Sequence, residues 1–304
     1  MYDVVIIGNG HAGLSAAIYG MRAGLKTLVV SDNPMGGGQI ATTYEVDNYP
    51  GLPKASGMEL GDKFEEHAKA LGAEFQNCRV ASIEDRGNEK VLVTDQGELV
   101  TKTVVIATGA DHRKLGIPGE KELTGMGVSY CATCDGAFFR NKEVAVVGGG
   151  DVALEDAIFL SRFASKVYLI HRRDAFRGAA VLQEQVKANE KIEIIYDTVV
   201  EAVVGSEAVE GLRLKNVKSG AEDQLSVRGV FMAVGTEPNV ASLQGLPEQD
   251  DKGYLIAGED CVTSVPGIYA AGDVRTKQLR QVITAAADGA NAITSIEKYL
   301  NGQG

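Results

Sequence analysis

The chain has 304 residues, of which 44% are apolar and 23% charged, a balance typical of folded globular proteins and a length that suits two domains. Its formal net charge of −11 argues against a general nucleic-acid-binding role, because neutralising phosphates requires a concentrated basic surface. No apolar run approaches the ~20 residues that cross a bilayer, and Met1-Tyr2-Asp3 leads directly into a short apolar run. We therefore expect a cytoplasmic protein without a membrane partner.

The chain begins with the pattern of a strand, a glycine-rich turn and a helix. Residues 4–7 form a continuous apolar run, typical of a parallel strand buried on both faces, and the run stops at Gly8-Asn9-Gly10-His11-Ala12-Gly13. Apolar side chains then recur at helical spacing to residue 23, and residues 27–30 read as the next strand. Such a turn lets the backbone approach a pyrophosphate, although glycines also end strands for packing reasons. After the second strand, Asp32 is the acid that can bind a ribose hydroxyl.

The same pattern recurs in the middle of the chain. A strand at 144–147 meets a turn at 148–153, a helix follows to residue 163, and residues 167–170 form the next strand. The segment after that strand, His171-Arg172-Arg173-Asp174-Ala175-Phe176-Arg177, has no acid at the strand end and carries three arginines. An isolated basic cluster is usually a solvated surface. In this position, however, arginines suit a 2′-phosphate, so the pattern favours NADPH over NADH.

The two patterns predict an α/β fold with two Rossmann-like nucleotide-binding domains, each a three-layer ββα arrangement. Further β-prone stretches, such as 91–93 and 227–234, complete the sheets. Proline and glycine cluster at 116–119 and around 238–247, which predicts two crossings between the domains. Residues 113–241 would then be a domain inserted between residues 1–112 and 242–304, which together form the other domain.

Two of the four cysteines are close neighbours, in Cys131-Ala132-Thr133-Cys134-Asp135. A two-residue gap allows a short disulfide ring and lowers the pKa of one thiol. Structural zinc would need two more ligands, normally a second close pair, and neither Cys78 nor Cys261 belongs to one. We therefore expect no metal, and we read Cys78 and Cys261 as small buried hydrophobes. A pair of unreactive buried cysteines remains an alternative, but the adjacent Asp135 offers the proton donor and acceptor that thiol chemistry needs.

The ordered motifs GNGHAG, CATCDG, GGGDVA, HRRDAFR and AAGDV resemble the low-molecular-weight thioredoxin reductases of bacteria, class II members of the pyridine nucleotide-disulfide oxidoreductases. The resemblance extends over essentially the whole chain and includes residues 36–51, 107–110 and 280–290. At His11 the family most often has proline. The resemblance implies that residues 1–112 and 242–304 bind FAD, whereas residues 113–241 bind NADPH and carry the cysteine pair.

The resemblance also implies which residues touch each cofactor. For FAD these are the loop from Asp32 to Gln39 and the following residues: Gly8, Gly10, His11, Ala12, Gly13, Asp32, Gly37, Gly38, Gln39, Asn48, Val80, Ala107, Gly109, Ala110, Gly272, Asp273, Arg280, Gln281 and Val282. For NADPH they are Gly149, Gly150, Asp151, Val152, Ala153, His171, Arg172, Arg173, Arg177 and Gly235.

The implied catalytic residues are Cys134 as the thiol next to the flavin, Cys131 as the thiol that attacks the protein substrate, and Asp135 as the proton carrier. Electrons would pass from NADPH through FAD and this disulfide to oxidised thioredoxin, with rotation of the inserted domain between the half-reactions, in a homodimer. Three alternatives remain. The partner could be another thioredoxin-like or peroxiredoxin-linked protein, ferredoxin could supply the electrons, or the protein could be a redox sensor without turnover. The second glycine turn and the arginines disfavour ferredoxin.

Overall fold

The computed structural model describes the chain except for residues 34–35, 44–45, 47, 241–242, 246 and 303–304. The chain divides into two compact units. Unit 1 contains Met1–Asp111 and Glu237–Gly304, and unit 2 contains His112–Thr236. The chain therefore crosses between the units near residues 111 and 236, whereas the sequence pattern placed the crossings near 113 and 241. At the crossings two short strands pair, β7 (Ala110–His112) and β16 (Thr236–Pro238).

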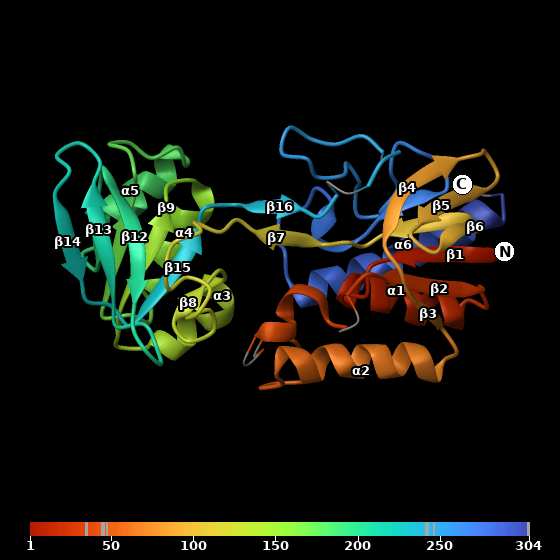
Figure 1. Ribbon diagram of the computed structural model, residues 1–304, viewed down its shortest axis with the longest axis horizontal. Coiled ribbons are helices and arrows are strands. Elements are labelled where there is room, and N and C mark those ends of the chain that lie inside the picture. The colour runs from red at the N-terminus through yellow and green to blue at the C-terminus, as the bar shows by residue number, and fades with distance from the viewer. Residues whose placement is uncertain (34–35, 44–45, 47, 241–242, 246, 303–304) are drawn as a thin grey trace. The chain divides into compact units, whose positions relative to one another are not determined.

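Unit 1 is built on a seven-stranded sheet whose central strands are parallel (Figure 1). The strand order is β3-β2-β1-β6-β5-β4, and β17 pairs with β6. Strands β4 and β5 run antiparallel to their neighbours, whereas β1 lies parallel to both β2 and β6. The strands are β1 (Tyr2–Ile7), β2 (Thr27–Ser31), β3 (Glu74–Asn77), β4 (Val80–Asp85), β5 (Lys90–Thr94), β6 (Gly97–Ile106) and β17 (Ile268–Ala270).

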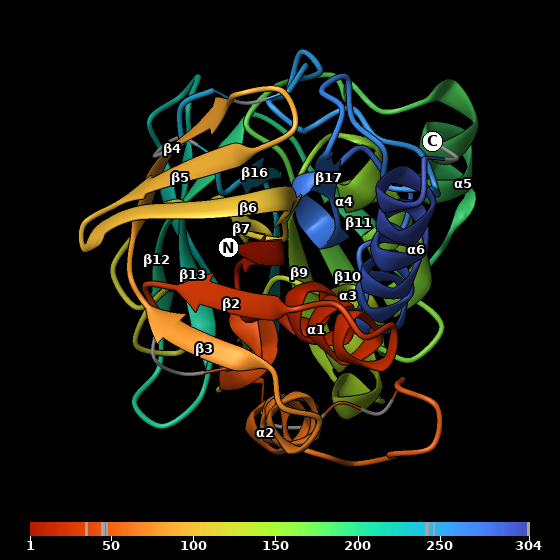
Figure 2. The ribbon, with the colours of Figure 1, turned by 90° about the vertical axis from the view of Figure 1, so that its right-hand side faces the viewer.

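The helices of unit 1 pack closely because glycine lies where they meet. Helices α1 and α6 run side by side (Figure 2), and a Cβ added at Gly289 of α6 would lie 2.2 Å from the carbonyl oxygen of Ala12 in α1. Only glycine allows this approach. The helical elements are α1 (His11–Arg22), η1 (Gly38–Thr42), α2 (Gly57–Ala70), η3 (Gly272–Val274) and α6 (Val282–Leu300).

Strand β1 divides its side chains between two cores. Val4 and Ile6 pack with helices α1 and α6, whereas Val5 and Ile7 pack on the other face with residues such as Leu255. Alternate residues of a strand point to opposite faces, and all four of these side chains are buried. The continuous apolar run at 4–7 therefore reflects a strand covered on both sides, and the turn after it is held by both cores.

Unit 2 repeats this architecture on a smaller scale. Its parallel sheet has the order β11-β10-β9-β15-β8, and a separate antiparallel sheet has the order β12-β13-β14. The strands are β8 (Val128–Ser129), β9 (Glu143–Gly148), β10 (Lys166–Ile170), β11 (Ile192–Ile195), β12 (Thr198–Val204), β13 (Gly211–Asn216), β14 (Glu222–Leu225) and β15 (Gly229–Ala233). The helical elements are α3 (Ala132–Asp135), η2 (Gly136–Phe139), α4 (Asp151–Leu160) and α5 (Ala180–Ala188).

Unit 2 has three layers, because the helices and the antiparallel sheet cover opposite faces of the parallel sheet (Figure 1). Val144 and Val146 of β9 pack with α4, whereas Ala145 and Val147 pack with β12 and β13. The expected α/β class with two Rossmann-type units is confirmed. In the described part of the chain, no helix combines the length and apolar character needed to span a bilayer.

Candidate active site

The first glycine turn combines two glycines that permit close packing with one that leaves the backbone open. Gly8 follows β1 at φ 111°, and a Cβ there would lie 2.3 Å from the carbonyl oxygen of Ala107. A Cβ at Gly13 would lie 2.0 Å from the carbonyl oxygen of Gly8. At Gly10 the nearest heavy atom would be the Cα of Gly38, at 3.8 Å. Gly8 and Gly13 are therefore required for packing, whereas the open side of Gly10 allows a ligand to approach the backbone.

Three buried polar atoms beside this turn have no hydrogen-bond partner among the described residues. They are Nε2 of His11, Oγ1 of Thr108 and Oδ1 of Asp273. They follow the carboxyl ends of β1, β6 and β17, which are neighbours in the sheet. Burial lowers the pKa of His11 to about 4 and raises the pKa of Asp273. Because buried polar groups are normally paired, this cluster fits a polar ligand such as a flavin nucleotide.

Several other predicted FAD residues are joined by hydrogen bonds. The side-chain amide of Gln39 donates to the carbonyl oxygen of Ala110 at 2.8 Å, and the backbone N–H of Gly37 donates to Asn9 at 3.2 Å. Nδ2 of Asn48 donates to Oε1 of Gln281 at 2.9 Å, directly before α6. Segments that are far apart in the sequence thus meet around the turn. Pro34 and Met35, in the predicted loop from Asp32 to Gln39, lie outside the described residues.

The remaining predicted FAD residues differ in whether the side chain or only the backbone is accessible to a ligand. Asp32 follows β2 with an exposed side chain, and Gly109 has no atom within 4 Å of an added Cβ. Val80 and Val282 are buried in hydrophobic cores, so mainly their backbones are available to a ligand. The guanidinium group of Arg280 lies over the ring of Tyr254, 4.2 Å from its centroid.

A buried charge network that sequence reasoning missed fixes the turn at Gly272 and Asp273. Asp288 of α6 accepts a hydrogen bond from the backbone N–H of Gly272 at 2.8 Å. It also accepts from Arg275, at 2.9 and 2.6 Å, and from Lys277, at 2.8 Å. Only 4% of Asp288 is exposed. The sequence signal for this network was the acid within the small-residue segment AAADGA. Small residues indicate close packing, and a carboxylate buried there requires partners.

The second glycine turn, in unit 2, is packed in a similar way. A Cβ at Gly148 would lie 2.4 Å from the carbonyl oxygen of Ala233, and at Gly149 it would lie 2.2 Å from the ring of His171. An added Cβ at Gly150 would meet nothing within 4 Å. Helix α4 begins at the next residue, so an open backbone again precedes a helix N-terminus. This geometry fits the pyrophosphate of a dinucleotide.

The loop with the arginines is fastened to this turn. The backbone N–H of Arg177 donates to the carbonyl oxygen of Gly149 at 2.8 Å, and Oδ1 of Asp151 accepts from the backbone N–H of Ala179 at 2.7 Å. His171 is buried, and its Nε2 lies 3.1 Å from the carbonyl oxygen of Ala175. This environment favours a role for His171 in holding the loop. Of the other predicted NADPH residues, Ala153 is buried, Val152 is exposed, and Gly235 adopts φ 111° beside Arg113.

The three arginines of this loop are available to bind an anion from solvent. Arg172, Arg173 and Arg177 are exposed, and none forms an ion pair with another described residue. The acid between them, Asp174, pairs with Lys218 at 3.0 Å. Their guanidinium groups are therefore not occupied by this neighbouring carboxylate, which suits recognition of a phosphate group.

The cysteine pair forms a disulfide, with the Cα atoms of Cys131 and Cys134 separated by 5.3 Å. Both residues are partly exposed; Cys131 is the N-cap of the single-turn helix α3, and Cys134 lies within it. The hydroxyl of Ser129 donates to Oδ2 of Asp135 at 2.6 Å and accepts from the backbone N–H of Cys131 at 3.1 Å. Burial raises the pKa of Asp135, whereas the hydrogen bond from Ser129 lowers it. A partly exposed disulfide in the same short segment as a carboxyl group with a raised pKa is suited to thiol–disulfide exchange.

The other two cysteines are free and buried. Burial raises the pKa of the Cys78 thiol, and it raises the pKa of Cys261 to about 12, so neither thiol favours the reactive thiolate. Among the described residues, no cluster of three or more histidine, cysteine or acidic side chains is arranged to hold a metal.

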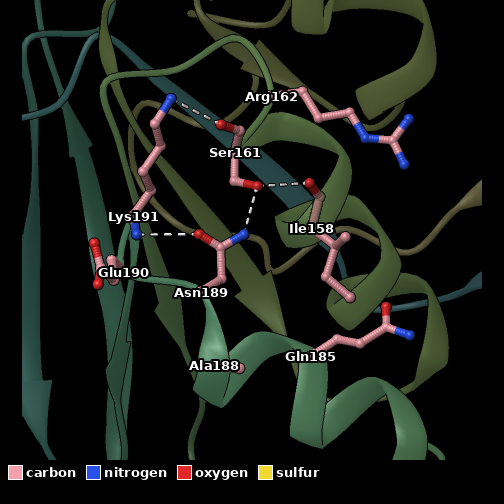
Figure 3. A pocket seen from close by; sticks show the side chains of 8 residues that line it. All are labelled: Ile158, Ser161, Arg162, Gln185, Ala188, Asn189, Glu190 and Lys191. Atoms are coloured by element: carbon pink, nitrogen blue, oxygen red, sulfur yellow. Dashed lines mark hydrogen bonds between the residues drawn. The ribbon is translucent and has the colours of Figure 1, made fainter.

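A shallow depression at the end of α4 contains none of the predicted site residues (Figure 3). Its polar side chains bond to one another and to the end of the helix. Nζ of Lys191 donates to the carbonyl oxygen of Ser161 at 3.1 Å, and Asn189 donates to the Ser161 hydroxyl at 2.8 Å. The hydroxyl of Ser161 in turn donates to the carbonyl oxygen of Ile158 at 2.7 Å. These contacts satisfy the last carbonyls of α4, and we assign the depression no chemistry.

Known proteins resemble this chain over nearly its whole length. A thioredoxin reductase of Listeria monocytogenes is 44% identical, with 99% of this chain and 94% of the relative covered. One from Peptoclostridium litorale is 45% identical, with 99% and 97% covered. The crystal structure of a thioredoxin reductase from Streptococcus pyogenes matches with a TM-score of 0.94 at 43% identity, covering 99% of both chains.

The family model that matches the chain agrees with these relatives and with the geometry. Residues 2–289 match the model described as pyridine nucleotide-disulphide oxidoreductase, a range that includes both glycine turns and the disulfide. The matched family and the similar thioredoxin reductases imply a flavin and a pyridine nucleotide. The chain therefore belongs to the pyridine nucleotide-disulphide oxidoreductase family and is an oxidoreductase that uses a flavin and a pyridine nucleotide.

Proposed function

We propose that the chain is a thioredoxin-disulfide reductase, which passes electrons from NADPH through FAD and the Cys131–Cys134 disulfide to oxidised thioredoxin. The observation that carries this proposal is the closed, partly exposed disulfide in the same short segment as Asp135, a partly buried acid whose pKa is raised by burial. The two glycine turns, one in each unit, supply the binding geometry for two nucleotides. The relatives described above are named thioredoxin reductases, which supports this choice of partner.

The residues around the first turn would hold FAD. The open backbone at Gly10 suits a pyrophosphate, and the unpaired atoms of His11, Thr108 and Asp273 suit the polar groups between pyrophosphate and ring. The chemistry that a bound flavin supplies is the transfer of two electrons between a reduced nicotinamide and a disulfide. Arg172, Arg173 and Arg177 would select NADPH through its 2′-phosphate.

The cysteine pair carries out exchange with the partner. Reduction breaks the bond between Cys131 and Cys134 and, with two electrons and two protons, leaves two thiols. The Cys131 thiolate then attacks a sulfur of the partner disulfide and forms a mixed disulfide, while the other partner sulfur leaves and takes a proton. Attack by Cys134 on the Cys131 sulfur restores the bond and releases the reduced partner. Asp135 accepts a proton as each thiolate forms and returns it to a leaving sulfur.

The nicotinamide, which gives electrons, and the disulfide, which takes them, have to reach one flavin in turn, so we propose that unit 2 rotates between half-reactions. The paired crossings β7 and β16 are flanked by Gly109, Gly116 and Gly235, each at positive φ, where glycine tolerates backbone change best. A covalent bridge that locks the units should preserve either reduction of the flavin by NADPH or reduction of the partner. Retention of both reactions at full rate would contradict rotation.

We further propose that the reductase works as a homodimer in the cytoplasm. The two cysteines outside the active pair are free, which agrees with a compartment that keeps thiols reduced. Light scattering of the purified protein measures the assembly directly. Another thioredoxin-like or peroxiredoxin-linked partner would use the same chemistry, because the cysteine pair sets the reaction and the docking surface sets the partner.

The test is turnover with NADPH and oxidised thioredoxin in wild type, Cys131→Ser and Cys134→Ser, with Cys78→Ala as a control at a buried cysteine outside the pair. We expect both serine variants to lose turnover, and Cys78→Ala to retain it. Turnover of Cys134→Ser at the wild-type rate would refute the mechanism. Reduction that stops after one round in the wild type would favour a redox sensor, and activity with another disulfide protein in place of thioredoxin would reassign the partner.

A further inference from the structure

Ser129 occupies an unusual position between the acid and the cysteine pair. It ends β8, only 5% of the residue is exposed, and its hydroxyl touches groups on both sides. The hydroxyl lies 2.6 Å from Oδ2 of Asp135, 3.1 Å from the backbone nitrogen of Cys131 and 3.3 Å from the carbonyl oxygen of Cys131. A serine hydroxyl has one proton to donate, so it cannot donate to Asp135 and to the Cys131 carbonyl together.

We propose that Ser129 is a positioning residue, which ties the carboxyl group of Asp135 to the backbone of Cys131 and directs its proton transfer with the cysteine pair. This inference rests on the proposed function, in which Asp135 carries the protons. When Asp135 is ionised, the Ser129 proton points to Oδ2, the nearer acceptor. When Asp135 takes up a proton, its own O–H donates to the Ser129 oxygen, and the Ser129 proton turns to the Cys131 carbonyl. No proton is lost, and the carboxyl group keeps its position in both states.

The hydrogen bond also opposes the effect of burial on Asp135. Burial is the larger influence and raises the pKa, whereas donation from Ser129 stabilises the anion and lowers it. The neighbouring elements offer few other charges: α4, which packs against α3, carries the titratable groups Asp151, Glu155 and Asp156, and η2 carries none. The cysteine thiols join this set once the disulfide is reduced. Removal of the Ser129 hydroxyl should therefore raise the pKa of Asp135 further.

The experiment measures kcat/KM for thioredoxin against pH in the flavin-loaded protein. Asp135→Asn first identifies the limb of the profile that belongs to Asp135. We expect Ser129→Ala to move that limb to higher pH by about one unit, because one charge-assisted hydrogen bond is lost. Ser129→Thr, which keeps the hydroxyl, should restore the position of the limb. Ser161→Ala is the matched control, because Ser161 is another buried serine of unit 2 and is not part of the active site. Flavin content and thermal unfolding show whether each variant is folded.

A shift in Ser129→Ala that Ser129→Thr reverses and Ser161→Ala lacks would support the inference. If Asp135→Asn removes the limb but Ser129→Ala leaves its position unchanged, Ser129 does not act on Asp135, and the proposed function stands. If Asp135→Asn leaves the profile unchanged, the proposed role of Asp135 is wrong and the inference fails with it. If Ser129→Ala does not fold, the pH dependence of the Asp135 carboxyl stretch in the infrared spectrum tests the same hydrogen bond. We then expect the stretch to titrate as in wild type in Ser129→Thr and at a shifted pH in Ser129→Cys.

Equal titration of the stretch in Ser129→Thr and Ser129→Cys would overturn the inference.

Discussion

The two glycine turns share a packing pattern and have different surroundings. Gly8 and Gly148 lie at the ends of strands, in close contact with a facing segment. An added Cβ would lie 2.3 Å from a carbonyl oxygen at Gly8 and 2.4 Å from one at Gly148. Gly10 and Gly150 each leave open space before a helix. The packing requirement is therefore the same in both units. What distinguishes the turns is the set of side chains that the rest of each unit brings to them.

The first turn is surrounded by buried polar atoms, and the second by exposed arginines. Each unpaired buried group costs about 1–3 kcal/mol until a ligand pairs with it, so a ligand that paired with these atoms would recover that free energy and be held firmly. The exposed arginines of unit 2 are hydrated when no phosphate is bound, so binding and release of a phosphate change the free energy little. The first turn therefore suits a cofactor that stays bound, whereas the second suits a nucleotide that arrives and leaves in every cycle.

We expect the largest loss of stability from a substitution at a turn glycine that has no room for a Cβ, and little loss at one that has room. Gly13→Ala places a Cβ 2.0 Å from a backbone oxygen, so we expect a loss of about 3 kcal/mol or more in the free energy of unfolding, with loss of bound flavin. Gly150→Ala meets no atom, and we expect less than about 0.5 kcal/mol. Thermal unfolding and the ratio of flavin to protein measure both. Equal damage from the two variants would contradict the packing account.

His11 makes the stability of unit 1 depend on pH. Its pKa falls to about 4 in the folded protein, so between pH 6.5 and 4 the unfolded chain binds a proton that the folded chain does not. Stability attributable to His11 therefore decreases as pH falls through this window, by about 2 kcal/mol between pH 7 and 5. Urea unfolding of flavin-free wild type and His11→Gln at several pH values measures the difference between them. A difference that stays constant with pH would mean that His11 is not buried in its neutral form.

The arginines of unit 2 should affect one nucleotide and not the other. In Arg172→Ala and Arg173→Ala we expect KM for NADPH to rise by about tenfold or more, while KM for NADH stays unchanged, because only NADPH has the 2′-phosphate. Arg213→Ala, an exposed arginine on β13, is the control. A parallel rise in KM for both nucleotides would place these arginines on a group that the two nucleotides share.

The smallest expected effect is at Asp32. Its side chain is exposed, so a hydrogen bond to a ribose hydroxyl competes with water, and we expect Asp32→Asn to weaken flavin binding by less than about tenfold. Fluorescence titration of flavin-free protein with FAD measures this. A loss of flavin as severe as in Gly13→Ala would show that the solvent-facing side of the site contributes as much as its packed side.

The sequence predicted the features that a few adjacent residues determine. Short apolar runs and glycines predicted strand β1 and the two turns, and the spacing of the cysteines predicted that they could form a disulfide. The partners of buried charges do not follow in this way. Asp288 reads as an ordinary helix acid until the fold brings Gly272 and Arg275 to it. Ser129 likewise shows its contact with Asp135 only once β8 and α3 are in place.

His171 illustrates the same limit in unit 2. The sequence groups it with the arginines of one basic segment, and the resemblance assigns it to NADPH together with Arg172, Arg173 and Arg177. In the structure its ring lies against Gly149 and is buried, while the arginines remain exposed. The division of a motif into residues that hold it and residues that face solvent depends on tertiary packing, which a one-dimensional pattern does not contain.

In the proposed mechanism the Cys131–Cys134 disulfide holds two electrons between flavin and partner, and an anaerobic titration with NADPH measures whether it does. Flavin and disulfide each accept two electrons, so wild type should consume about two equivalents of NADPH per flavin before free NADPH accumulates. Cys134→Ser should consume about one equivalent, because only the flavin remains. Consumption of a single equivalent by the wild type, with no difference from Cys134→Ser, would contradict the account.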